Sequence, residues 1–434
     1  MPPELPQEDS PLDRATGALL AKKYDECLAW AGGVLRRNLS SPSGLYLVGR
    51  AFAGLDRKAE ADDALALAVE AAIDAGVLGV GIAAAQERRR LGGDAAGSIA
   101  ALARAFAKGS GRLREGTPPK PPGAMTGVTA LTSRGEALHA EVDVLVETSR
   151  SSPRASTTIA PVSPFSSLGE AALAKLLERL EPMDVPRDTV VVEEGSPGED
   201  AFVVVRGRLA VRRDEQRLTL AHLSAGALFG EMALLARAPR AATVAAVVPT
   251  IVLRAPKDAL DEVGEEVPEV AHELAAHCLR RMVENLERTS PVLAAVPASE
   301  RSSLVSSLET RVYERGDALI VEGQGAEGLF LIASGEVAVM KREPGASEAL
   351  VLAALGPGDT AGEVALVLRR AATADVVATH PTVALFLSKT AFLELIQEHP
   401  LVIARLYALA VQRDDENLRL LSDEVLSADD VVLV

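Results

Sequence analysis

The second half of the chain contains the same pattern twice, and this duplication limits the possible fold more than any other feature of the sequence. Four short motifs recur in the same order, the first two at an offset of 128 residues. The pairs are Val192-Glu-Glu-Gly195 with Val321-Glu-Gly323, Gly207-Arg-Leu-Ala-Val211 with Gly335-Glu-Val-Ala-Val339, Gly230-Glu-Met-Ala-Leu234 with Gly362-Glu-Val-Ala-Leu366, and Arg240-Ala-Ala-Thr243 with Arg370-Ala-Ala-Thr373. Several motifs matched in one order predict two copies of a single domain.

Each copy is predicted to consist of short strands followed by a helix. In the first copy, runs rich in β-branched residues alternate with turn residues, which is typical of strands. The predicted strands are Thr189–Glu193, Phe202–Val205, Arg208–Val211 and Thr243–Leu253, and a helical pattern covers Val267–Glu287. Strands that reverse about every ten residues favour a β-roll or a β-sandwich.

Residues 11–110 are rich in Ala and Leu, and they repeat with a period of 34 residues. The repeated positions are Cys27, Ala61 and Ala95; Ala31, Leu65 and Ile99; Val34, Ala68 and Leu102; and the small residues Ala15, Gly49 and Ala83. Small residues at a fixed phase let paired helices approach closely. The pattern resembles the tetratricopeptide repeat, an antiparallel helix pair of this length, although of that family's aromatic positions few are filled, one by Phe52. The alternative is an Ala-rich helical bundle without a repeat geometry.

Composition marks the boundaries between the parts. Clusters of Gly, Pro, Ser and Thr between residues 111 and 163 predict a linker with one short helix at Gly135–Glu147. The predicted order is a disordered N-terminus over 1–10, helical repeats over 11–110, the linker over 111–163, a first β-roll domain over 164–288, a second over 289–410, and a C-terminal helix with an acidic tail over 411–434. The expected fold class is therefore multidomain α + β.

Charge and composition exclude several classes of function. The net charge of −16 and the aromatic content of 3% argue against nucleic-acid binding, which needs basic surface and stacking side chains. The two cysteines are far apart and the six histidines do not cluster, so no metal site is expected. No motif of a kinase loop, a serine hydrolase or a metalloenzyme occurs, so no catalytic residues are expected. The N-terminus lacks the apolar core of a signal peptide and no apolar run reaches 18 residues, so a cytoplasmic location is expected.

The segment Phe229–Val244 is the best candidate for a binding site. Gly230 lets the backbone turn and lie close to a ligand. A short helix over Glu231–Leu235 would present free N–H groups that favour an anion, and Pro239 would end it. Arg240 offers a planar fork of donors suited to two phosphate oxygens, while the glutamate can accept a hydrogen bond from a sugar hydroxyl. The segment therefore predicts a ligand that carries an anion beside a hydroxyl.

The same segment is similar to the phosphate-binding cassette of cyclic nucleotide-binding domains, as found in the regulatory subunits of cAMP-dependent protein kinase and in bacterial catabolite activators. The order Phe-Gly-Glu-x-Ala-Leu, a short insert and Pro-Arg-Ala-Ala-Thr is met without a gap. The resemblance implies an eight-stranded β-roll with flanking helices, in which Glu231 holds the ribose 2′-hydroxyl and Arg240 binds the cyclic phosphate. The other implied contacts are the backbone N–H groups of Gly230, Ala241 and Ala242, and the side chain of Ala233.

The resemblance also bears on which base is preferred. In that family, a Thr directly after the phosphate-binding arginine can hydrogen-bond guanine. Here that position is Ala241, which has no hydroxyl. The expected ligand is therefore cAMP, with cGMP as the second possibility.

The second copy departs from the pattern. Ala361 replaces Phe229, Arg369 stands where Pro239 stood, and two residues are missing from the insert. A possible weaker site retains Gly362, Glu363, Arg370, Ala371 and Ala372. Because a shorter insert displaces the arginine from the glutamate, the second copy is expected to bind cyclic nucleotide weakly or not at all.

The predicted function is a non-enzymatic cyclic-nucleotide receptor that couples binding in the first β-roll to partner proteins through the helical repeats. One alternative is a cyclic-nucleotide-responsive regulatory subunit of a kinase, which would need a basic inhibitor sequence; Arg154-Ala-Ser156 is a poor version of one. Another is a transcription regulator of the catabolite-activator type without a recognisable DNA-binding domain. The tail from Arg413 to Val434 is interpreted as a solvated helix face with a frayed end.

Overall fold

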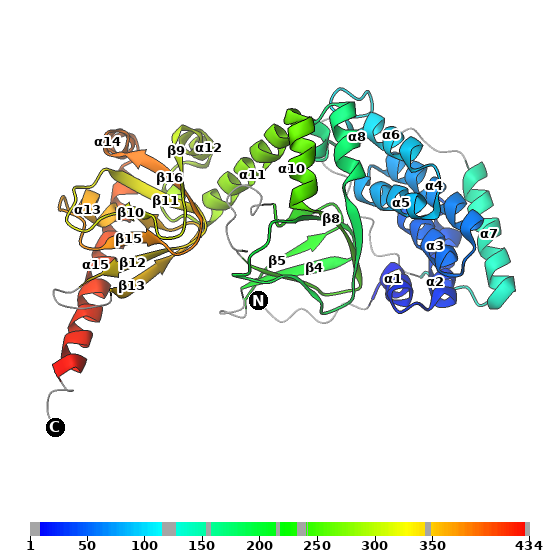
Figure 1. The fold of residues 1–434 in the computed structure, drawn as a ribbon, viewed down its shortest axis with the longest axis horizontal. Helices are drawn as coiled ribbons and strands as arrows, with labels where there is room; N and C mark the ends of the chain where they lie inside the picture. Colours follow the sequence, from blue (N-terminus) through cyan, green and yellow to red (C-terminus); the bar gives the residue numbers. More distant parts are fainter. Residues whose placement is uncertain are drawn as a thin grey trace. The chain divides into compact units, whose positions relative to one another are not determined.

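The computed structural model describes residues 9–114, 127–152, 158–213, 218–231, 240, 242–342 and 349–429. Helices fill the N-terminal part, and two β domains with flanking helices follow (Figure 1). The contacts divide the chain into two compact units, residues 1–234 with 242–277 and residues 235–241 with 278–434. One boundary falls after His277, within a long helix. This order of elements confirms the predicted multidomain α + β fold class.

Helices α1 to α6 occupy residues 11–106, and each packs against the next one along the chain (Figure 1). They are α1 (Pro11–Leu20), α2 (Tyr24–Arg37), α3 (Pro42–Gly54), α4 (Lys58–Ala75), α5 (Leu78–Leu91) and α6 (Ala95–Phe106). Two of them begin where the sequence places a serine before a proline. The hydroxyls of Ser10 and Ser41 accept hydrogen bonds from the first turns of α1 and α3, which stabilises both helix starts.

All the positions of the 34-residue pattern are buried in this part of the structure. Gly49 illustrates why one of them is small, since an added Cβ would lie 2.6 Å from Cγ of Leu65 on the neighbouring helix α4. The small residues therefore allow the close helix contacts that the periodicity predicted. The tetratricopeptide geometry itself stays a prediction.

Helix α7 (Gly135–Ser151) lies inside the stretch that composition marks as a linker. It is longer than the predicted helix and packs against α2 and α4 through Leu138, Val142 and Val146. The helical part of the chain therefore includes a segment that Gly and Pro clusters separate from it in the sequence. The 3-10 turn η1 (Phe165–Ser167) and helix α8 (Glu170–Glu178) then lead into the first β domain.

The first β domain contains two four-stranded antiparallel sheets. Its strands are β1 (Glu181–Val185), β2 (Val190–Val192), β3 (Ala201–Arg206), β4 (Arg208–Arg213), β5 (Leu218–Ser224), β6 (Leu228–Phe229), β7 (Thr243–Ala246) and β8 (Thr250–Ala255). The strand orders are β1-β8-β3-β6 and β2-β7-β4-β5. A core between the sheets joins Val204 and Val252 of one with Leu209 and Val244 of the other.

The run Thr243–Leu253, predicted as one strand, is two strands in different sheets, so this prediction was wrong. The chain turns at residues 247–249, where Pro249 interrupts the run. Thr250 starts β8, and its side chain packs against the turn between β3 and β4. Gly207 in that turn has φ +95°, and an added Cβ would lie 2.3 Å from the Thr250 hydroxyl oxygen, so only glycine fits there.

The outer face of the first sheet is covered by the N-terminal helices. Helix α5 packs against β3 and β1. Alternate residues of β3 point to opposite faces of the sheet. Val203 and Val205 share a core with Leu78 and Val80 of α5, while Phe202 and Val204 belong to the core between the sheets. This explains why every residue of β3 is buried.

Arg206, the last residue of β3, adds a charged contact between the first β domain and the N-terminal helices. Its side chain is buried and donates hydrogen bonds to the hydroxyl of Thr16 and, at 3.0 Å, to the carboxylate of Asp13 in α1. Burial lowers the pKa of Arg206, and Asp13 opposes that shift. The first β domain and the N-terminal helices therefore share both an apolar core and a buried ion pair.

The second β domain repeats the arrangement of the first. Its strands are β9 (Glu309–Tyr313), β10 (Ala318–Ile320), β11 (Gly328–Ser334), β12 (Val337–Lys341), β13 (Leu350–Leu355), β14 (Thr360–Ala361), β15 (Asp375–Ala378) and β16 (Thr382–Ser388). They form two four-stranded antiparallel sheets in the orders β14-β11-β16-β9 and β10-β15-β12-β13. Both β domains therefore have the sandwich-like form predicted from the duplicated motifs.

Helices follow each β domain. After the first come α10 (Lys257–Glu266) and α11 (Pro268–Thr289), and α11 matches the helix predicted over Val267–Glu287. The turn η2 (Leu293–Ala295) and helix α12 (Ala298–Ser307) precede the second domain, α13 (Glu363–Val367) lies within it, and α14 (Lys389–Glu398) and α15 (Pro400–Asp429) follow it. Helix α15 packs against α13 and α14.

No helix among the described residues has the length and apolar character that crossing a bilayer requires. No group of three or more His, Cys, Asp or Glu side chains in the part of the chain that the structure describes is arranged to hold a metal ion. Cys27 and Cys278 are both buried and neither forms a disulfide, and burial raises the pKa of the Cys27 thiol to about 12.

Candidate functional site

The first copy of the motif begins at the end of strand β6. Phe229 pairs with Phe202 of β3, and the two rings stack with centroids 5.1 Å apart. Gly230 follows with φ +77°, a conformation that side chains rarely adopt. Glu231 comes next, and its side chain is buried. The aromatic contact thus anchors the glycine turn that directs the glutamate inward.

Arg240 and Ala242 are the other predicted site residues of the first copy that the structure describes. The side chain of Arg240 is buried, with 8% of its surface exposed, and Ala242 leads directly into β7. Ala233 and Ala241 lie outside the described residues, as does Arg154-Ala-Ser156. A buried carboxylate is rare without polar or charged partners, so Glu231 marks a polar position in the first copy of the motif.

The second copy of the motif, residues 362–373, is described along its whole length. Gly362 has φ +90°, and an added Cβ would lie 2.7 Å from the carbonyl oxygen of Gly328, so glycine is required there. Glu363 follows as the first residue of α13 and is 2% exposed. Ala361, which replaces the aromatic of the first copy, pairs with Phe330, whose ring instead packs against Phe386 with centroids 4.9 Å apart.

The predicted phosphate ligand of the second copy has a protein partner. Arg370 forms an ion pair with Asp414 of helix α15. Arg369, in the place of the first copy's proline, has φ +53°, which a proline ring fixed near −65° cannot adopt. The backbone N–H of Ala372 donates a hydrogen bond to the carbonyl oxygen of Gln324 at 2.9 Å. This N–H therefore already has a protein acceptor. Ala371, between Arg370 and Ala372 in the sequence, is exposed.

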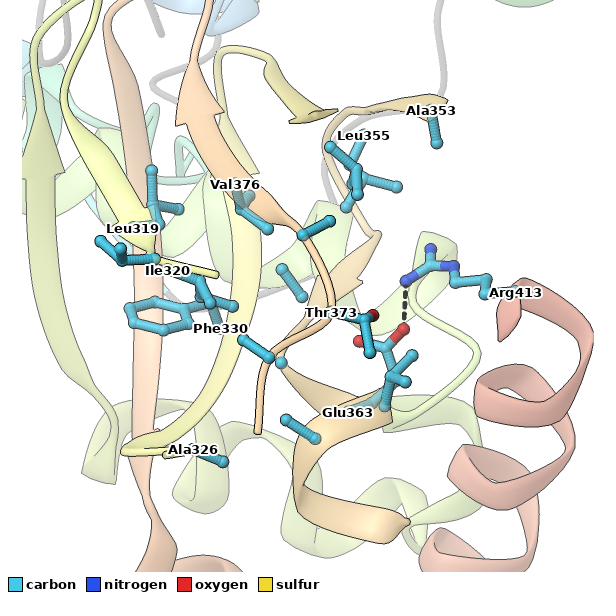
Figure 2. Close-up of a pocket in the computed structure, with 18 of the residues that line it drawn as sticks. Leu319, Ile320, Ala326, Phe330, Ala353, Leu355, Glu363, Thr373, Val376 and Arg413 are labelled. Carbon is cyan, nitrogen blue, oxygen red and sulfur yellow. Dashed lines mark hydrogen bonds and ion pairs between the residues drawn. The ribbon is translucent and has the colours of Figure 1, made fainter. Parts of the chain in front are cut away.

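Glu363 is also paired with helix α15. Nη1 of Arg413 donates to Oε1 of Glu363 at 2.7 Å and to the carbonyl oxygen of Thr360. Burial raises the pKa of the Glu363 carboxyl, and the positive charge of Arg413 partly offsets that rise. Figure 2 shows Arg413 extending from the helix to this carboxylate. Oε2 of Glu363 is buried and accepts no hydrogen bond from the described residues.

The sequence interpretation of the tail needs correction at these two positions. The segment starting at Arg413 was expected to be a solvated helix face, but Arg413 and Asp414 contact the motif of the second copy. The sequence carries a weak signal for this, because the two opposite charges stand side by side. No periodicity of α15 alone indicates which of its faces meets the β domain.

A cavity of about 760 Å³ opens beside Glu363 in the second domain. Ile320, Phe330, Leu355 and Val376 line its apolar side, and Glu363 and Arg413 lie at its polar side (Figure 2). This volume falls within the range of sites for small organic ligands. The arrangement suits a flat apolar group at one side and a hydroxyl at the other.

The family model of the cyclic nucleotide-binding domain matches this chain twice, over residues 182–266 and 310–399. The two matches cover the two β domains. They confirm the resemblance drawn from the repeated motifs and show that the chain carries two such domains in tandem.

Among curated proteins, the chain is similar to regulatory subunits of cAMP-dependent protein kinase. The subunit of Yarrowia lipolytica is 29% identical over 202 residues, which are 46% of this chain and 50% of that protein. The subunit of Pyricularia oryzae is 32% identical over 225 residues, which are 49% of this chain and 55% of that protein. The chain therefore spans about half the length of the curated relatives it matches.

Among solved structures, the co-crystal structure of the regulatory domain of Toxoplasma gondii PKA with cAMP is 23% identical to this chain. It aligns with a TM-score of 0.28 and covers 57% of this chain and 91% of that one.

Proposed function

Because the chain carries two cyclic nucleotide-binding domains in tandem, we propose that it is a cyclic-nucleotide-responsive regulatory subunit whose first domain binds cAMP. The observation that carries the proposal is the unbroken motif of the first domain, with its glycine turn at Gly230 and the buried side chain of Glu231. In the proposed complex, Glu231 accepts a hydrogen bond from the ribose 2′-hydroxyl and Arg240 binds the cyclic phosphate. The N–H groups of Gly230, Ala241 and Ala242 and the side chain of Ala233 complete the site.

The role of Arg240 is tested by replacing it with alanine in the full chain. Arg240→Ala removes a charge-assisted contact to the phosphate, and we expect cAMP binding to weaken by about 2–4 kcal/mol. Isothermal titration calorimetry measures the change. Arg212→Ala, at an exposed arginine of strand β4 in the same domain, is the matched control and should leave binding unchanged. Equal affinity in the Arg240 variant and the wild type would rule out this site.

The proposed partner is a protein kinase catalytic subunit. The names of the curated relatives favour this alternative over a general receptor that acts through helical repeats, and the repeats remain a second candidate surface for partner contacts. In this proposal, the chain itself catalyses no reaction. Binding of the nucleotide would change its affinity for the kinase, since a ligand shifts an equilibrium only through different affinities for two states.

An inhibition assay tests the kinase partner. The full chain, added to the purified catalytic subunit of cAMP-dependent protein kinase, is expected to reduce peptide phosphorylation, and cAMP is expected to restore it. The Arg240→Ala chain should still inhibit but should need more cAMP for release. A wild-type chain that binds cAMP tightly and yet leaves the kinase fully active would exclude this partner while leaving the nucleotide site in place.

A further inference from the structure

Both charged groups of the second motif are held by consecutive residues of helix α15. Glu363 accepts from Arg413 at 2.7 Å, and Arg370 forms an ion pair with Asp414. The charges are matched in order: the basic residue of the helix meets the acid of the motif, and the acidic residue meets the base. These two motif residues are the ones that the family resemblance assigns to the ribose hydroxyl and the phosphate.

The contacts of Arg413 are built into the fold. It also donates to the carbonyl of Thr360 and lies 3.6 Å from a carboxylate oxygen of Asp359, in the loop and strand just before Gly362. The contact of Arg370 follows from the local backbone, because the left-handed conformation of Arg369 sets the direction in which the next residue leaves α13. Arg370 is absent from the lining of the cavity, whereas Arg413 is part of it.

Among the described residues, no side chain of helix α15 is known to fill the apolar side of the cavity in the way that Arg413 occupies its polar side. Its volume of about 760 Å³ is bounded there by side chains such as Ile320, Phe330 and Leu355. Oε2 of Glu363 also remains buried without a hydrogen bond from the described residues. Space for a base and an acceptor for a hydroxyl are therefore both present, and helix α15 engages the groups that would bind the charged end of a ligand.

We propose that Arg413 and Asp414 form a built-in competitor for the second domain: Arg413 takes the place of the ribose hydroxyl at Glu363, and Asp414 takes the place of the cyclic phosphate at Arg370. The inference rests on the proposed function, because it assumes that the motif is a nucleotide site. A cyclic nucleotide therefore competes with Arg413 for the Glu363 carboxylate and must displace Asp414 to reach Arg370. Since the competitor belongs to the same chain, its effective concentration is high and constant.

The test uses the full chain with Arg240→Ala, so that the first domain is silent, and cAMP as the probe. Asp414→Asn keeps the size of the side chain and removes the charge that holds Arg370. Asp414 and Arg370 are partly exposed, so their ion pair is weak, and we expect Asp414→Asn to tighten cAMP binding about two- to fivefold in calorimetry. Asp415→Asn is the matched control, because it makes the same change at the next, exposed residue of α15 and should give no gain.

Two results would overturn the inference. One is an Asp414→Asn chain that binds cAMP no better than the Asp415→Asn chain. The other is a gain that persists when Arg370→Ala is added, because the gain must act through Arg370. Failure of the proposed function is scored separately, as the absence of an Arg240-dependent site in the wild-type chain.

Hydrogen exchange provides a measurement that needs no variant of α15. In the Arg240→Ala chain at saturating cAMP, the backbone amides around Arg413 and Asp414 should exchange faster than without ligand, because the ligand displaces Asp414 from Arg370 and competes with Arg413 for Glu363. Slower exchange in this turn of α15 would show that the ligand stabilises the helix, and unchanged exchange would show that the ligand has no effect on it. Either result would also overturn the proposal.

Discussion

At position 370 the residue type is the one that the repeated motif predicts, but its partner is not. The sequence identifies Glu363 and Arg370 as candidate ligands because their spacing and neighbours repeat those of Glu231 and Arg240. It does not identify Asp414 as the partner of Arg370, since 44 residues separate the two and only the packing of helix α15 brings them together. Sequence motifs therefore identify the groups that are proposed to bind the ligand, whereas the partners of these groups in the structure depend on tertiary packing.

Base preference is also decided by single residues. Ala241 follows the proposed phosphate-binding arginine and has no hydroxyl that could bond guanine. We expect the wild-type chain to prefer cAMP over cGMP, and Ala241→Thr to improve cGMP binding about tenfold through one added hydrogen bond of about 1 kcal/mol or slightly more. A competition assay with both nucleotides measures the ratio. Ala241→Ser tests whether the hydroxyl suffices, and Ala241→Val, which has the shape of Thr without the hydroxyl, should show no gain.

At the scale of the elements, the sequence predicted types better than boundaries. The β-branched runs were strands and the helix after the first domain was a helix, because their periodicities are strong and local. The split of Thr243–Leu253 into β7 and β8 was missed, although Pro249 marks the turn, because the run is apolar on both sides of it. Helix α7 was only partly anticipated, since its partners α2 and α4 lie far away in the sequence. Local sequence patterns do not predict which helices and strands pack against each other.

At the scale of the whole molecule, the structure joins parts that composition separates. The N-terminal helices and the first β domain share an apolar core, which includes Val80 of α5 and Val205 of β3. They also share the buried contact between Asp13 and Arg206. The Ala-rich pattern predicted the helices and the motif repeat predicted the β domain, but neither indicates that one covers the outer face of the other.

The buried ion pair between Asp13 and Arg206 allows the contact between the N-terminal helices and the first β domain to be tested by mutation. Asp13→Asn leaves the charge of Arg206 buried without its carboxylate, and we expect the free energy of unfolding of this part of the chain to fall by about 3 kcal/mol. Asp13 also belongs to the cap of α1, so Ser10→Ala serves as the control and should cost only about 1 kcal/mol. Urea denaturation followed by circular dichroism gives both values. Equal losses in the two variants would mean that the cap, rather than the ion pair, accounts for the effect of Asp13.

The contact of helix α5 with strand β3 has a consequence for any protein that binds the N-terminal helices. If such a protein favours one arrangement of this contact, and a nucleotide in the first domain favours the same one, each raises the affinity of the other by an identical factor. The dissociation constants of the nucleotide and of the protein partner, each measured with and without the other ligand, then form a closed thermodynamic cycle. Titrating the protein partner at several nucleotide concentrations therefore measures the communication between the two sites, even where no displacement of the backbone can be seen.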